Sequence, residues 1–222
     1  MYLQRFTNIP GRVASGLLLL AALLLAACSS TGPAVRDDAR ATGNAALTRG
    51  EDGAMQVSPA AQTLFEQAAA TMASGDLLDA ELRFKELLLQ YPDIPAAQVN
   101  LAIIHSSNGN DEAARAAIDA ALQIDPDFAP ALNQLGMLLR RNGNFPEAEA
   151  AYLKAVTVSP EYALAHYNLG VLNELYLQRL DIALQHFEQY QALVGDDEQV
   201  EKWIADLERR VAANQRTANV AE

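Results

Sequence analysis

Several kinds of residue are scarce in this 222-residue sequence, and each scarcity excludes a class of protein. There is one cysteine, Cys28, which excludes an internal disulfide framework and a zinc site built from several cysteines. Aromatic residues make up only 6% of the chain, which argues against a β-rich fold, because strands favour aromatic and β-branched side chains. The 16 basic residues are outnumbered by 28 acidic ones, for a net charge of −12. Proteins that bind nucleic acid through its phosphates need the opposite sign, so we expect no nucleic-acid partner.

Long apolar runs are also missing from the sequence. The longest, residues 17–27, has 11 residues, about half of the roughly 20 that a helix needs to span a bilayer. Two basic residues, Arg5 and Arg12, precede this run, and no acidic residue occurs before Asp37. A basic start followed by a short apolar run is typical of a secretory signal peptide.

The four residues that end this run, Leu-Ala-Ala-Cys at positions 25–28, resemble the lipobox of bacterial lipoproteins. The resemblance implies that residues 1–27 are a lipoprotein signal peptide that is removed and that Cys28 is acylated. Ser29 resembles the residue that follows the cysteine in lipoproteins sorted to the outer membrane. It implies a chain anchored by lipid at the periplasmic face of that membrane. The alternatives are an ordinary cleaved signal with an unrelated cysteine, or an uncleaved anchor.

Residues 28–60 are rich in Ala, Gly, Ser, Thr and Asp, and their few large apolar residues are isolated. Such a segment cannot bury a core, so the composition predicts a flexible tether between the lipidated cysteine and a folded body. About 30 flexible residues would separate their ends by roughly 30 Å.

From residue 61 onward the sequence repeats itself with a period of 34 residues. Small, large apolar, turn and proline positions all keep this spacing: Ala80, Ala114 and Ala148; Phe84, Ile118 and Tyr152; Gly75, Gly109 and Gly143; Pro92, Pro126 and Pro160. This pattern resembles the tetratricopeptide repeat, in which each unit is a pair of antiparallel helices. The resemblance implies an all-α solenoid of four helix-turn-helix repeats at residues 61–94, 95–128, 129–162 and 163–196.

Two features of these repeats make local predictions. Gly136 and Gly170 fall where the first helix of a repeat approaches the second, so we expect no room for a larger side chain there. The fourth repeat carries one extra residue near positions 176–180 and has Gln178 where glycine is expected. We therefore predict an irregular turn in repeat four, with Gly195 ending its second helix.

A further amphipathic helix is predicted at residues 197–214, because Val200, Trp203, Ile204, Leu207 and Val211 follow helical spacing. It would cap the solenoid, and residues 215–222 would form a disordered tail. Two interpretations of Trp203 remain open. It packs over repeat four, or it anchors a partner, since tryptophan is enriched in binding hot spots.

We find no pattern that predicts catalysis. The three histidines, His105, His166 and His186, are not spaced three or four apart on one helix, so they predict no metal pair. The nucleophile-elbow, zinc-protease and phosphate-loop motifs are absent from the sequence. We therefore expect a protein that is not an enzyme and that uses no cofactor or metal.

The family resemblance implies a peptide-binding groove lined by the first helix of each repeat. The matching positions in this chain are Phe65, Val99, Ile103, Asn133, Met137, Arg140, Arg141, Tyr167, Val171 and Glu174. Their apolar members would form a stripe able to receive a helix or an extended peptide. The alternative is that some of them only pack against neighbouring helices.

These features favour a non-catalytic lipoprotein scaffold that binds a protein or peptide partner in the cell envelope. The chain resembles the repeat lipoproteins of type IV pilus biogenesis that promote secretin assembly. Two alternative roles are an accessory of a TonB-type energy-transducing complex and an adaptor for peptidoglycan hydrolases. An enzyme or a small-ligand carrier is a further alternative, which a deep polar pocket would favour.

Overall fold

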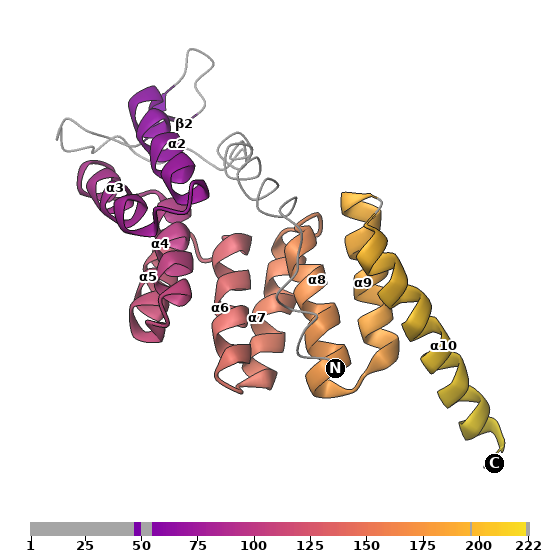
Figure 1. Cartoon of the computed structure of the whole chain (residues 1–222). Coiled ribbons are helices and arrows are strands. Elements are labelled where there is room, and N and C mark those ends of the chain that lie inside the picture. Colours follow the sequence, from indigo (N-terminus) through magenta and orange to yellow (C-terminus); the bar gives the residue numbers. More distant parts are fainter. Residues whose placement is uncertain (1–46, 50–54, 196, 221–222) are drawn as a thin grey trace. The chain divides into compact units, whose positions relative to one another are not determined.

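The computed structural model describes residues 47–49, 55–195 and 197–220. Apart from two three-residue strands, the described residues form helix-turn-helix pairs followed by a C-terminal helix (Figure 1). The predicted all-α fold class is therefore confirmed. The predicted signal peptide and Cys28 lie outside the described residues.

The predicted tether, residues 28–60, contains more regular structure than we expected. Strand β1 (Leu47–Arg49) pairs antiparallel with strand β2 (Met55–Val57), with Leu47 opposite Val57. The first helix also begins earlier than predicted, at Pro59, because the Ser58 side chain accepts a hydrogen bond from the Ala61 backbone N–H and caps the helix. The expectation of a structureless tether is thus corrected for the two strands and for residues 58–60.

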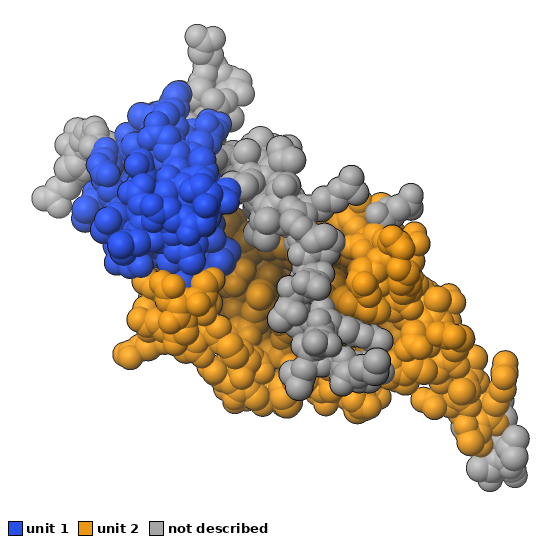
Figure 2. Space-filling model, in the orientation of Figure 1, with its two compact units in different colours: residues 1–104 blue, residues 105–222 orange. Residues whose placement is uncertain are grey.

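The chain divides into two compact units, residues 1–104 and residues 105–222 (Figure 2). The helices of unit 1 are α2 (Pro59–Ala73), α3 (Leu77–Gln90) and most of α4 (Pro95–Ser107). Phe65 of α2 packs edge-to-face on Phe84 of α3, with ring centroids 5.7 Å apart. Ala68 and Ala80 are fully buried in the same unit, and such small residues let two helices approach closely.

Unit 2 contains the end of α4 and all the later elements. They are α5 (Asp111–Ile124), α6 (Ala129–Arg141), α7 (Phe145–Val158), α8 (Ala163–Leu172), the π-helical turn η2 (Asn173–Leu177), α9 (Leu180–Val194) and α10 (Glu198–Val220). Helix α6 packs against α7, and α8 packs against α9 (Figure 1).

The predicted close approach at Gly136 and Gly170 is confirmed. A Cβ atom placed on Gly136 would lie 2.5 Å from Cε1 of Tyr152, and one placed on Gly170 would lie 2.8 Å from the Phe187 ring. Tyr152 and Phe187 are both fully buried. In repeats three and four the large ring on the second helix therefore occupies the space above a glycine on the first helix.

The predicted irregular turn in repeat four is also confirmed. Helix α8 runs into the π-helical turn η2, which ends at Gln178 in the left-handed conformation with φ 57°. The Gln178 side chain donates a hydrogen bond to the Glu174 carbonyl at 3.1 Å, which stabilises the turn. Gly195, with φ 83°, ends α9 as expected.

The C-terminal helix α10 extends further than predicted. It continues to Val220, so residues 215–220, which we predicted as part of a disordered tail, are helical. The apolar stripe of α10 packs on repeat four, where Val200, Ile204 and Leu207 are buried. No helix among the described residues is long and apolar enough to cross a membrane.

Candidate functional site

Helix α6 carries four of the predicted groove residues on one face, at positions 133, 137, 140 and 141. They differ in exposure: Met137 is 38% exposed and Arg141 is exposed, whereas Arg140 is half-buried and Asn133 is only 1% exposed. Asn133 is therefore an interior residue. Its Oδ1 accepts a hydrogen bond from Nδ2 of Asn168 on α8 at 2.9 Å, which joins the inner helices of repeats three and four.

Asn168 was missed by the sequence analysis. It lies 35 residues after Asn133, one residue more than the repeat period, so the repeat alignment does not pair them. The buried Tyr162 hydroxyl lies near the same amide. Burial raises the pKa of Tyr162 well above its usual value, and its hydrogen bond with Asn133 acts against this rise. A polar cluster thus sits inside the packed body.

Arg140 and Arg141 are adjacent but differ in their contacts. Arg141 forms an ion pair with Asp111, and its Nη1 donates a hydrogen bond to the Ser106 carbonyl at 3.1 Å. In Arg140, Nη1 is buried and has no hydrogen-bond partner among the described residues. Burial raises the pKa of the Tyr152 and Tyr167 phenols to about 12. The nearby Arg140 charge acts in the opposite direction and lowers both pKa values. Arg140 is therefore a half-buried cation of this face, held near these aromatic side chains and not by an ion pair that the described residues show.

Tyr167 lies at the centre of an aromatic cluster that joins α8, α9 and α10. Its ring centroid is 5.9 Å from Phe187, 5.3 Å from Tyr190 and 5.9 Å from Trp203. Trp203 also contacts Phe187, at 5.6 Å. The indole thus packs over repeat four, which supports the first of the two interpretations of Trp203. Tyr167 keeps part of its surface exposed.

Two predicted groove residues of repeat four are covered by α10. Val171 is 3% exposed and packs in one cluster with Val200, Ile204 and Leu207. Glu174 is 7% exposed and pairs with Arg210 at 2.8 Å between Oε1 and Nη1. The expectation that Val171 and Glu174 line an open groove is corrected, because the C-terminal helix occupies these positions.

The predicted residues of unit 1 are largely buried as well. Phe65 is 2% exposed because it packs on Phe84, and Val99 is 7% exposed. Both are core residues rather than groove residues, which corrects that expectation. Ile103 is half-buried. Of the predicted groove residues in unit 2, Met137, Arg140, Arg141 and Tyr167 keep exposed surface, and we call these four the α6–α8 surface.

The structure also brings together two histidines that lie 20 residues apart in sequence. Nδ1 of His166 on α8 is 3.2 Å from Nδ1 of His186 on α9, and Nε2 of His166 is 3.1 Å from the Pro160 carbonyl. A carbonyl only accepts, so Nε2 of His166 donates. Burial, and to a lesser extent His166, lower the pKa of His186 to about 4. Among the described residues there is no group of three or more His, Cys, Asp and Glu side chains that could hold a metal ion.

Two profiles of the tetratricopeptide repeat match residues 71–137 and 133–198, which together make up more than half of the sequence. The chain belongs to the tetratricopeptide repeat family. Repeats of this family generally act as non-catalytic scaffolds, and they indicate a protein partner. No curated protein sequence matches the chain significantly.

Solved structures agree with this fold. PilF of Pseudomonas aeruginosa is similar with 23% identity over 69% of this chain and 70% of that one, at a TM-score of 0.62. A tetratricopeptide repeat protein of Thermus thermophilus has 20% identity over 66% and 80% of the two chains, at a TM-score of 0.58. MamA of Desulfovibrio magneticus RS-1 has 17% identity over 73% and 91%, at 0.55. At these identities the likeness concerns the fold.

Proposed function

We propose that this tetratricopeptide repeat protein is a non-catalytic adaptor of the bacterial cell envelope, which recruits a protein partner through the α6–α8 surface. The observation that carries this proposal is the combination of an exposed thioether, Met137, with the half-buried guanidinium of Arg140 on the same face of α6. Arginine and flexible apolar side chains are common anchors in protein interfaces. A partner segment with an apolar residue and a carboxylate would satisfy both.

The contacts around this surface support its use for binding. The Tyr167 ring packs against Phe187 and Tyr190 of α9 and Trp203 of α10, so its exposed part is presented rigidly. Arg141 is fixed by Asp111 and the Ser106 carbonyl. A surface with fixed side chains loses little conformational entropy when a partner binds. Only four of the ten predicted groove residues belong to the α6–α8 surface. A binding surface of four side chains suits a short peptide segment better than a large domain.

The second part of the proposal concerns location. The lipobox-like residues 25–28 support acylation of Cys28 and attachment to the periplasmic face of the outer membrane. The resemblance to lipoproteins of type IV pilus biogenesis, together with the fold likeness to PilF of P. aeruginosa, supports a role in assembling an envelope complex. A scaffold tethered to a membrane raises the local concentration of its partner there.

Charge reversal tests the binding surface. Arg140→Glu should reduce recovery of crosslinked envelope partners by about tenfold or more, because loss of an interface anchor commonly weakens binding by about 2 kcal/mol. Arg209→Glu is the matched control, since Arg209 lies on α10 with its side chain 77% exposed. Circular dichroism should show equal helix content for both variants. Equal partner recovery from Arg140→Glu and the wild type would place binding elsewhere on the protein.

Replacement of the single cysteine tests the anchor. Cys28→Ser should abolish labelling by a clickable fatty acid and leave the precursor uncleaved, because the thiol is the acylated atom. Membrane flotation of wild type and variant in a sucrose gradient gives a second measurement. A variant that is still processed at the same position and still floats with the membrane would refute the lipid anchor while leaving the adaptor proposal intact.

A further inference from the structure

We infer that helix α3 of unit 1 lies on a phospholipid surface through three exposed leucines, Leu78, Leu82 and Leu89, which we call the leucine stripe. These side chains are 72%, 59% and 86% exposed. The inference rests on the lipid anchor proposed above, which holds the chain at a membrane. It concerns a part of the protein that the α6–α8 surface does not include.

The leucine stripe lies along one side of α3. With successive residues about 100° apart around a helix, its three positions fall within an arc of about 40° and extend over about 16 Å of the helix axis. The opposite side of α3 carries Ala80, Phe84 and Leu87, which are fully buried. Helix α3 therefore has one apolar side in the core of unit 1 and a second apolar stripe in contact with solvent.

The later repeats show that the fold does not require leucines at these positions. The equivalent residues of the second, third and fourth repeats are all exposed, and none of them is a large apolar residue: Glu112, Ala116 and Gln123; Pro146, Ala150 and Thr157; Asp181, Gln185 and Ala192. A continuous exposed apolar surface marks an interaction site. The leucine stripe is thus particular to the first repeat, and so is the contact that it makes.

The place of the first repeat in the chain favours a membrane as the surface that it contacts. Cys28, the residue proposed to carry the lipid, lies about 30 residues before Pro59, where α2 begins, and a flexible segment of that length spans roughly 30 Å. The pairing of Leu47 with Val57 brings the two ends of residues 47–57 together, so fewer residues separate the anchor from α2. Helix α3 follows directly after α2.

The anchor also explains why three leucines are sufficient. An interfacial helix binds a bilayer in proportion to the apolar area that it buries there, and a stripe of this size gives weak binding by itself. Tethering makes the contact intramolecular and raises the effective concentration of the lipid surface. A weak contact is then enough to keep α3 on the membrane.

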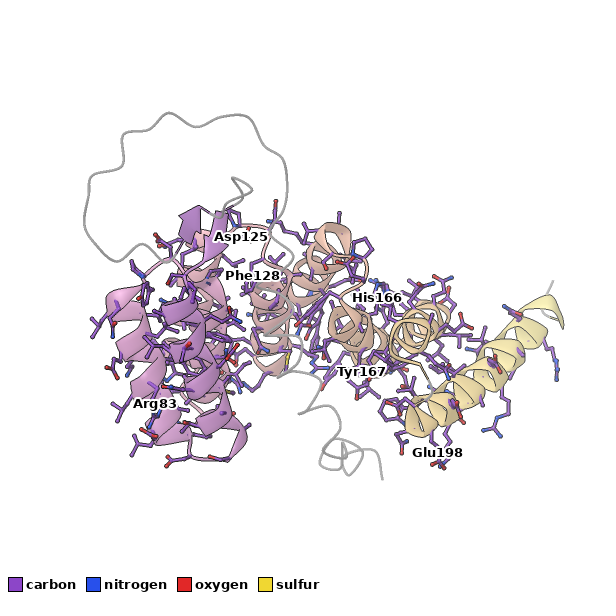
Figure 3. All side chains as sticks on the ribbon, turned by 90° about the horizontal axis from the view of Figure 1, so that it is seen from above. Arg83, Asp125, Phe128, His166, Tyr167 and Glu198 are labelled. Carbon is purple, nitrogen blue, oxygen red and sulfur yellow. The ribbon has the colours of Figure 1, made fainter. Side chains whose placement is uncertain are left out.

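The charges of α3 fit a neutral phospholipid surface. Arg83, labelled in Figure 3, and Lys85 are the only Lys or Arg residues between positions 50 and 114, and both are exposed on this helix. Arg83 pairs with Asp79 at 2.8 Å, and Lys85 pairs with Glu81 at 2.5 Å, so Glu86 is the acid that leaves α3 with one net negative charge. Lys85 falls within the arc of the leucine stripe, where its long stem can lie along acyl chains while the ammonium group stays among the headgroups. In a chain with a net charge of −12, this nearly neutral helix suits a zwitterionic surface.

Quenching of tryptophan fluorescence by brominated lipids tests this contact. The thiol of Cys28 in the full chain is coupled to a maleimide lipid in vesicles of phosphatidylethanolamine and phosphatidylcholine with brominated acyl chains. This coupling supplies the anchor chemically, so the result does not depend on acylation in cells, which the Cys28→Ser experiment tests separately. Leu82→Trp should lose fluorescence relative to the same chain on unbrominated vesicles, after subtraction of the parent chain, in which Trp203 is the only tryptophan.

The matched control is Ala116→Trp, since Ala116 is the exposed equivalent of Leu82 in the second repeat. This variant should show no quenching beyond that of the parent chain. Adding Leu78→Gln and Leu89→Gln to Leu82→Trp should abolish the quenching, with unchanged helix content by circular dichroism, because both positions are exposed. Equal quenching of the two tryptophan variants, or quenching that survives the two glutamine substitutions, would overturn the inference. So would sedimentation of the uncoupled chain as a dimer that the same two substitutions dissociate, because a second copy would then cover the leucine stripe.

Discussion

Substitution of Gly136 tests whether the crossing of α6 and α7 depends on the absence of a side chain. The Cβ of Gly136→Ala would lie 2.5, 2.6 and 2.8 Å from three atoms of the Tyr152 ring. Ordinary carbon–carbon contacts lie near 3.5–4.0 Å, so the ring or the helix has to move by about 1 Å. Tyr152 is fully buried and packs in one cluster with Leu169 and Leu172, so a shift of its ring disturbs these neighbours.

Two effects of opposite sign determine how much Gly136→Ala changes the free energy of unfolding. An alanine is favoured over glycine inside a helix by about 1 kcal/mol. Overpacking a filled core is unfavourable by about 1–3 kcal/mol, and occasionally more. Because three rigid ring atoms are involved rather than the end of a flexible chain, we expect the upper part of that range. The net loss in free energy of unfolding is then about 2 kcal/mol, or about 4–8 °C in melting temperature for a chain of this size.

Urea unfolding followed by circular dichroism measures this loss. The matched control is the same substitution in a Tyr152→Leu background, where the ring is gone and Gly136→Ala should be neutral or stabilising by up to about 1 kcal/mol. Gly136→Leu in the wild-type background should prevent folding of the α6–α7 pair. An alanine variant as stable as the wild type, or equal effects in the two backgrounds, would refute the reasoning.

Two further predictions concern buried polar side chains, Asn168 on α8 and Glu174 in the η2 turn. Arg210→Ala should destabilise the protein by more than about 1 kcal/mol in thermal unfolding, because the nearly buried Glu174 carboxylate loses its ion pair. The control Arg209→Ala, on the exposed side of the same helix, should change stability by less than about 0.5 kcal/mol. Equal effects of the two substitutions would contradict a contribution from the Glu174 pair. Asn168→Ala should lower the free energy of unfolding by about 1–3 kcal/mol in urea titrations, since Oδ1 of Asn133 is left buried without a donor, whereas an unchanged midpoint would show that water replaces the amide.

The groove residues were predicted correctly only in the part of the repeat array that no end helix covers. A helix position is assigned to a face by spacing alone, so Met137 and Arg141 are on the exposed part of α6 as the repeat register implies. Whether that face is then covered depends on elements distant in sequence. The C-terminal helix was recognised from its apolar stripe, but spacing did not say which residues of α8 and η2 it would bury. It buries Val171 of α8 and Glu174 of η2.

The sequence by itself determined the features that are local or periodic. The 34-residue period sets the helix pairs, Gly136 and Gly170 set the close approaches, and the extra residue before Leu180 sets the π-helical turn, because each acts through neighbours on the same or the adjacent helix. Only the tertiary structure decided the meeting of His166 with His186, of Asn133 with Asn168 and of Glu174 with Arg210. These pairs lie 20 to 36 residues apart. Their contacts depend on the rotation and offset of packed helices, which vary with side-chain packing and are not encoded in any single helix.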